Sequence, residues 1–159
     1  MPLHDQLQDI LDSLGGFGPV VWLSVPFSVG LVLDLVLTHQ LGVERAKKWL
    51  AGFTALSLTI AALWAVLTPE RGFLFLHLLF LDNQAIFVQV IVSITAILII
   101  AYNHFSIPLS SLPPPSPHLI LGLTIGLFLL TTSVNLLAIY LSLELVSVSS
   151  YLLTALSGS

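Results

Sequence analysis

Long apolar runs are the feature that most constrains what this chain can fold into. Five such runs lie at about residues 20–38, 49–68, 85–102, 118–134 and 136–156. A helix needs roughly 20 apolar residues to cross the hydrocarbon core of a bilayer. Helices also satisfy their own backbone polar groups there. The sequence therefore predicts an all-α integral membrane protein with about five transmembrane helices, in a membrane domain that covers 19–159.

The composition excludes several classes of function. Only 8% of the residues are charged and 57% are hydrophobic, whereas soluble domains carry about 25% charged residues. The net charge of −4 and the four Lys and Arg residues argue against nucleic-acid binding. The absence of cysteine excludes disulfides, thiolate metal sites, iron–sulfur ligation and cysteine nucleophiles. The histidines form no i, i+4 pair with another ligand, so no metal site is expected.

Residues 1–18 form a leader with a different pattern. It contains acidic residues but no Lys or Arg, which does not fit a cleavable signal peptide. Its apolar residues share one helical face; they are Leu3, Leu7, Ile10, Leu11 and Leu14. The leader is therefore predicted to be a short amphipathic helix at the membrane surface.

Two connecting segments interrupt the apolar runs. Residues 73–81 are apolar but too short to span a bilayer, so we expect an interfacial or re-entrant segment there. Asp82 follows and is suited to cap the third spanning helix. The segment 103–117 contains five prolines and is predicted to be a stiff connector.

The basic residues predict the orientation. Arg45, Lys47 and Lys48 lie together between the first two runs, which places that loop in the cytoplasm by the positive-inside rule. The N-terminus is then outside and the C-terminus inside. Arg71 is the single basic residue on the other side.

Glu144 is the acidic residue deepest in an apolar run. It lies eight residues into the fifth run, which is ~12 Å along a helix and near the middle of a ~30 Å core. Ser147 and Tyr151 follow at i+3 and i+7, and Tyr140 precedes at i−4, so the four residues form a polar stripe. Such a stripe is expected to face protein or water. Intramembrane carboxylates commonly handle protons, although a protonated Glu bonded to a neighbouring helix is the structural alternative.

The fourth run carries Gly122 and Gly126. This small-xxx-small spacing lets another helix approach closely.

Residues 118–156 resemble the fourth and fifth helices of the antiporter-like membrane subunits of respiratory complex I, especially the subunit N (subunit 2) type. The resemblance rests on a Glu-x-x-Ser-x-x-x-Tyr pattern, present here as Glu144, Ser147 and Tyr151. Two weaker similarities lie upstream. Asp34 corresponds to the aspartate of the family's first helix, and residues 81–87 are similar to the start of the family's third helix.

The resemblance implies a proton-translocating subunit of an NADH–quinone oxidoreductase. Glu144 would be the proton carrier, supported by Ser147 and Tyr151. The chain itself would bind no cofactor, while the assembled complex would use quinone and NADH. The implied partners are other membrane subunits and the lipid bilayer. The implied location is a bacterial inner (plasma) membrane or an organellar inner membrane.

Two alternatives remain open at this stage. One is a module of a cation/proton antiporter outside any redox complex, and the other is a non-catalytic membrane scaffold. Family members have about three times this length. The resemblance therefore implies either part of a longer or split subunit, or a chain that works only with partners.

Overall fold

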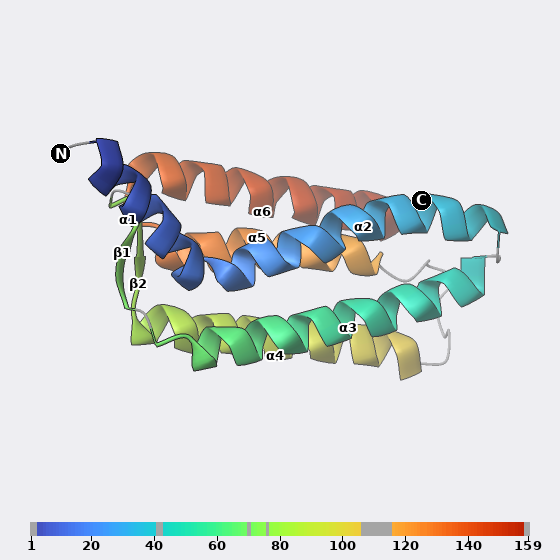
Figure 1. Ribbon diagram of the computed structural model, residues 1–159. Helices are drawn as coiled ribbons and strands as arrows, with labels where there is room; N and C mark the ends of the chain where they lie inside the picture. The colour runs from blue at the N-terminus through green and yellow to red at the C-terminus, as the bar shows by residue number, and fades with distance from the viewer. Residues whose placement is uncertain (1–2, 41–42, 70, 76, 106–115, 158–159) are drawn as a thin grey trace.

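A computed structural model of the chain describes residues 3–40, 43–69, 71–75, 77–105 and 116–157, and about 85% of these are helical. The helices are α1 (Leu3–Gly16), α2 (Gly18–Gln40), α3 (Val43–Leu67), α4 (Asn83–Phe105), α5 (Pro117–Thr132) and α6 (Leu136–Ser157). Each of α2 to α6 contains most or all of one of the five apolar runs, and these helices lie side by side along one direction (Figure 1).

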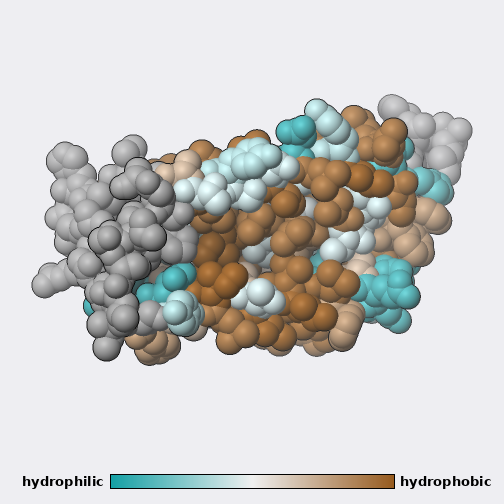
Figure 2. Space-filling view, turned by 180° about the vertical axis from the view of Figure 1, so that it is seen from behind, coloured by the Kyte–Doolittle hydropathy of each residue, from teal (hydrophilic) through white to brown (hydrophobic). Residues whose placement is uncertain are grey.

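The lengths and composition of these helices agree with an all-α membrane protein. In the described residues, three stretches are long and apolar enough to cross a membrane: Lys48–Leu67, Asn83–Asn103 and Leu136–Ala155. Gly18–Leu33 and Pro117–Thr132 are shorter apolar helical stretches. Apolar side chains cover much of the middle of the molecule in Figure 2. The prediction of an all-α membrane fold is confirmed as far as the length and composition of the helices are concerned.

Helix α5 lies at the centre and packs against α2, α3, α4 and α6. Its sequence is apolar on every side, with no charged residue in Pro117–Thr132, as expected for a helix surrounded by others. Phe128 and Leu121 are fully buried in a core that also includes Leu23 of α2 and Leu58 of α3.

The two glycines of α5 are sites of close helix contact. A Cβ on Gly126 would lie 2.8 Å from Val146 Cγ2 of α6, and a Cβ on Gly122 would lie 2.9 Å from the Phe27 ring of α2 and 3.0 Å from Ser149 Oγ of α6. These distances are shorter than van der Waals contact. The predicted role of the small-xxx-small spacing is therefore confirmed, with helices of the same chain as the partners.

The segment 73–81, expected to be interfacial or re-entrant, forms most of a β-hairpin. Strands β1 (Gly72–Leu74) and β2 (Leu79–Leu81) pair antiparallel, with Leu74 opposite Leu79. Their side chains alternate, since Leu74, Leu79 and Leu81 are buried while Phe73 is exposed, as the two-residue period of a strand requires. The chain turns back between the strands with positive φ at Phe75 and His77.

The hairpin crosses one end of the bundle and joins several elements there (Figure 1). The backbone N–H of Val134, in the α5–α6 turn, donates to Leu78 O at 3.3 Å, and the N–H of Phe75 donates to Ser13 Oγ of α1 at 3.0 Å. The N–H of Ala85 donates to Asp82 Oδ1 at 2.6 Å. The predicted cap of α4 by Asp82 is thus confirmed.

Helix α1 exposes its apolar face. Ser13 and Gly16 are buried, whereas the large side chains on the other side are exposed; these are Leu7, Ile10, Leu11 and Leu14. The predicted helix exists, and its apolar residues point away from the protein interior.

Some sequence predictions concern residues outside the described part. These are residues 106–115 of the proline-rich connector and the side chains of Asp34, Arg45 and Lys47.

Candidate functional site: a carboxylate at mid-span of α6

Glu144 lies near the middle of α6 on an exposed face. It follows Leu136, the first residue of the helix, by eight positions, which corresponds to ~12 Å along the axis. Only 11% of the membrane-length stretch Leu136–Ala155 is buried in the chain, against 33% for the corresponding stretches of α3 and α4. Helix α6 is therefore the least covered of these three helices.

The packing against α5 decides where Glu144 points. Ser142 and Ser149 are buried, and Val146 lies over Gly126, so these residues define the inner face of α6. Ser142 Oγ lies 3.2 Å from Ser133 Oγ at the end of α5. Residues two positions apart on an α-helix differ by about 200° around its axis. Glu144, two positions from both Ser142 and Val146, consequently projects away from α5.

Tyr140 and Glu144 are brought together. Tyr140 lies one turn before Glu144 on the same exposed face, as residues four positions apart on a helix do. A phenol in this position is able to donate to an ionised carboxylate, which makes a charge-assisted hydrogen bond.

Ser147 and Tyr151 lie on the same side of the helix as Glu144, and their hydrogen bonds are to other residues of α6. Ser147 is half-buried and its carbonyl accepts from Ser150 Oγ at 2.9 Å. Tyr151 is exposed, and its carbonyl accepts from Thr154 Oγ1 at 2.9 Å. Within the described part of the chain, neither side chain makes a hydrogen bond to Glu144. They line the surface beside the carboxylate.

The described basic side chains do not reach the carboxylate. Lys48 and Arg71 lie near opposite ends of α3, and Arg71 donates to Asn83 Oδ1 and to the Thr68 carbonyl. Glu144 at mid-span therefore has Tyr140 as its neighbour in place of a cation.

Sequence reasoning missed two polar contacts inside the bundle. Gln89 of α4 is buried, and its Nε2 donates to Thr131 Oγ1 of α5 at 3.5 Å. Trp22 Nε1 of α2 donates to the Ser57 carbonyl of α3 at 3.3 Å. The signal for the first was a lone glutamine inside the run 85–102, a residue type that joins helices in membranes.

The described residues contain no group of three His, Cys, Asp or Glu side chains that could hold a metal ion. His118 was expected at a span end. It does lie in the first turn of α5, but it is buried, with its Cβ facing Gly30 of α2.

Comparison of the chain with models of protein families, with curated proteins and with solved structures gave no match.

Proposed function

We propose that this chain is a proton-translocating membrane-arm subunit, or the N-terminal part of one, of an NADH–quinone oxidoreductase. Glu144 is its proton-carrying residue. The observation that carries the proposal is the position of this carboxylate, at mid-span of α6 on a face that the rest of the described chain leaves open. The resemblance of 118–156 to antiporter-like subunits supplies the reaction class.

A charge is costly to place in the hydrocarbon core of a membrane. An ionised carboxylate at the middle of a bilayer costs at least ~2.5–3.5 kcal/mol. The cost is avoided when the group is protonated, or when water or protein covers it. A group that alternates between these conditions takes up and releases a proton.

In this proposal α2 to α6 are five spans, with the N-terminus outside and the C-terminus inside. Glu144 accepts a proton from a hydrated region on one side of the membrane and releases it toward the other. The Tyr140 hydroxyl donates to the carboxylate between these steps, since the phenol lies one turn away on the same exposed face. Ser147 and Tyr151 line the route, and other membrane subunits complete it.

The redox chemistry belongs to other subunits. NADH and quinone are used elsewhere in the assembly, and this chain moves the proton in response.

The decisive experiment is Glu144→Gln in the complete assembly. Glutamine keeps the size and hydrogen-bonding capacity of the side chain but cannot release a proton. We expect NADH oxidation and assembly on a native gel to persist while NADH-driven proton uptake into vesicles is lost. Leu141→Gln is the matched control, since it places an amide on the same exposed face and keeps Glu144; it should leave pumping intact.

The other functions predict different outcomes. A cation/proton antiporter module would show Glu144-dependent transport driven by a sodium gradient without NADH and quinone. In a scaffold subunit, Glu144→Gln would leave pumping unchanged, and that result would remove Glu144 from the mechanism.

A further inference from the structure

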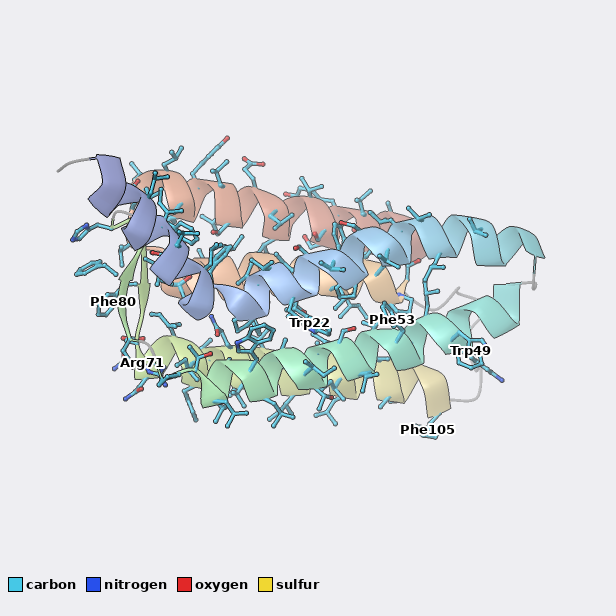
Figure 3. All side chains as sticks on the ribbon, viewed as in Figure 1. Trp22, Trp49, Phe53, Arg71, Phe80 and Phe105 are labelled. Carbon is cyan, nitrogen blue, oxygen red and sulfur yellow. The ribbon has the colours of Figure 1, made fainter. Side chains whose placement is uncertain are left out.

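A groove lies on the surface of α3 at the end opposite the hairpin. Among the described residues it is lined by Lys48, Trp49, Gly52, Phe53 and Leu56, and its volume is about 450 Å³. Volumes of roughly 300–1,000 Å³ are typical of sites for small ligands. Figure 3 shows Trp49 and Phe53 on this part of α3, far from Arg71 and Phe80.

Gly52 lies in the groove and has no side chain to fill it. A Cβ built on Gly52 would meet nothing within 4 Å, which distinguishes this glycine from the crowded pair in α5. Trp49 and Leu56 lie one turn to either side of Gly52 on the same face, and Phe53 borders it. Trp49 is 74% exposed and Phe53 is 41% exposed, so two aromatic rings flank an open slot.

The groove runs from a charged end to an apolar end. Lys48 is the first residue of the membrane-length stretch Lys48–Leu67, so its ammonium group would lie at the level of the lipid headgroups when this stretch spans a bilayer. Trp side chains are enriched at this level. Phe53 and Leu56 lie one to two turns deeper, where acyl chains begin.

We infer that this groove binds an anionic phospholipid, with the phosphate at Lys48 and one acyl chain along Gly52. The charge of the segment supports an anionic headgroup, because Arg45, Lys47 and Lys48 are three of the four basic residues in the chain. Basic residues beside a membrane helix attract anionic lipids.

A neighbouring helix fits this groove less well than an acyl chain does. Helices that dock on a glycine need small residues around it so that the backbones can approach. Here the glycine is bordered by Trp49, Phe53 and Leu56, whose bulk keeps another backbone away and leaves room for a single hydrocarbon chain. Lipid binding in this groove is independent of any role of Glu144, which lies on α6.

The experiment uses Trp49 as the reporter. In the full chain with Trp22→Phe and Trp64→Phe, Trp49 is the one remaining tryptophan, since the chain has three. The protein is reconstituted in phosphatidylcholine bilayers containing a small fraction of phosphatidylglycerol, and either lipid is supplied with brominated acyl chains, which quench tryptophan on contact. We expect brominated phosphatidylglycerol to quench Trp49 with an apparent preference of about fivefold, the size expected of one lysine near an anionic lipid.

Substitutions at two positions distinguish the contribution of the lipid headgroup from that of the acyl chain. Lys48→Gln should abolish the preference for phosphatidylglycerol, and Lys48→Arg should keep it. Gly52→Leu should fill the groove and reduce quenching of Trp49 by both brominated lipids, with an unchanged circular dichroism spectrum. A protein that keeps Trp64 as its sole tryptophan is the control, and Gly52→Leu should not alter its quenching.

Equal quenching of Trp49 by the two lipids in the protein with Lys48 and Gly52 intact would overturn the inference. So would unchanged quenching in Gly52→Leu. Weak quenching of Trp49 by both lipids would mean that protein covers the groove, and this result would also overturn the inference.

Discussion

Gly126 of α5 lies directly against Val146 of α6. A Cβ at Gly126 would come within 2.8 Å of Val146 Cγ2 and 3.0 Å of the Val146 backbone nitrogen. Because one of these atoms belongs to the backbone, a larger residue cannot be accommodated by a side-chain rotation alone. This contact sets the separation of the two helices and, through it, the direction in which Glu144 projects.

Replacing Gly126 by alanine should therefore destabilise the protein, by about 1–3 kcal/mol as for other overpacked sites. Gly52→Ala is the matched control, because it adds the same methyl group to a helix in open space and should stabilise the helix slightly. Thermal unfolding followed by circular dichroism in detergent measures both variants. Equal midpoints for the two alanine variants would contradict the close contact.

Asp82→Ala should loosen the start of α4. The variant loses the oxygen that accepts from the Ala85 N–H at 2.6 Å, and loss of such a cap costs about 1 kcal/mol. Asp82→Asn retains an acceptor and should keep most of this stability. Hydrogen exchange at the first-turn amides of α4 is the measurement, and exchange as slow in Asp82→Ala as in the parent protein would show that the cap contributes nothing.

Tyr140→Phe should slow proton transfer without affecting assembly. The variant keeps the ring but loses the hydroxyl that we propose donates to Glu144, one turn away on the same face. Tyr151→Phe is the control, since it removes a hydroxyl from the same side of α6 that lies two turns from the carboxylate. NADH-driven proton uptake in vesicles should fall more in Tyr140→Phe. A larger loss in Tyr151→Phe would assign the supporting role to the other tyrosine.

Leu11 of α1 should lie in lipid. It is 65% exposed on the apolar face of the helix, and interfacial helices bury such faces at the headgroup boundary. The chain has no cysteine, so Leu11→Cys can carry a single spin label without further changes. In bilayers we expect this label to collide with oxygen more than with a water-soluble relaxation agent.

Two exposed positions calibrate the α1 measurement. A label at Val25 of α2 should report lipid, and a label at Gln84, in the first turn of α4, should report water. If the label at Leu11 behaves like the one at Gln84, α1 stands in the aqueous phase. Shielding of Leu11 from both agents would mean that protein covers it.

The positions of α2 to α6 were predictable because the length of a run of apolar residues is enough to identify a membrane-length helix. The cap at Asp82 was also found from the sequence, since a polar residue between two apolar runs has few roles other than a cap or turn. The hairpin was not found. Residues 73–81 are apolar on both faces of each strand, so the alternation that identifies a strand is hidden.

The outward direction of Glu144 was also beyond the sequence. Helical spacing shows that Tyr140, Glu144, Ser147 and Tyr151 share one side, but it does not show which neighbour lies opposite. The direction of Glu144 depends on Gly126, because the absence of a side chain there allows the Val146 side of α6 to pack against α5. For the same reason the pairing of Gln89 with Thr131 required the structure, because the two residues lie on different helices.

The contacts made by the hairpin have a mechanical consequence. Its hydrogen bond to Val134 ties the turn before α6 to one end of the bundle, so we expect α6 to move least at this end. Glu144 lies ~12 Å from the first residue of α6, about two-fifths of the way along the helix. A sideways displacement of the distal end of α6 would therefore move the carboxylate by about two-fifths as much, without breaking the hairpin that anchors the near end.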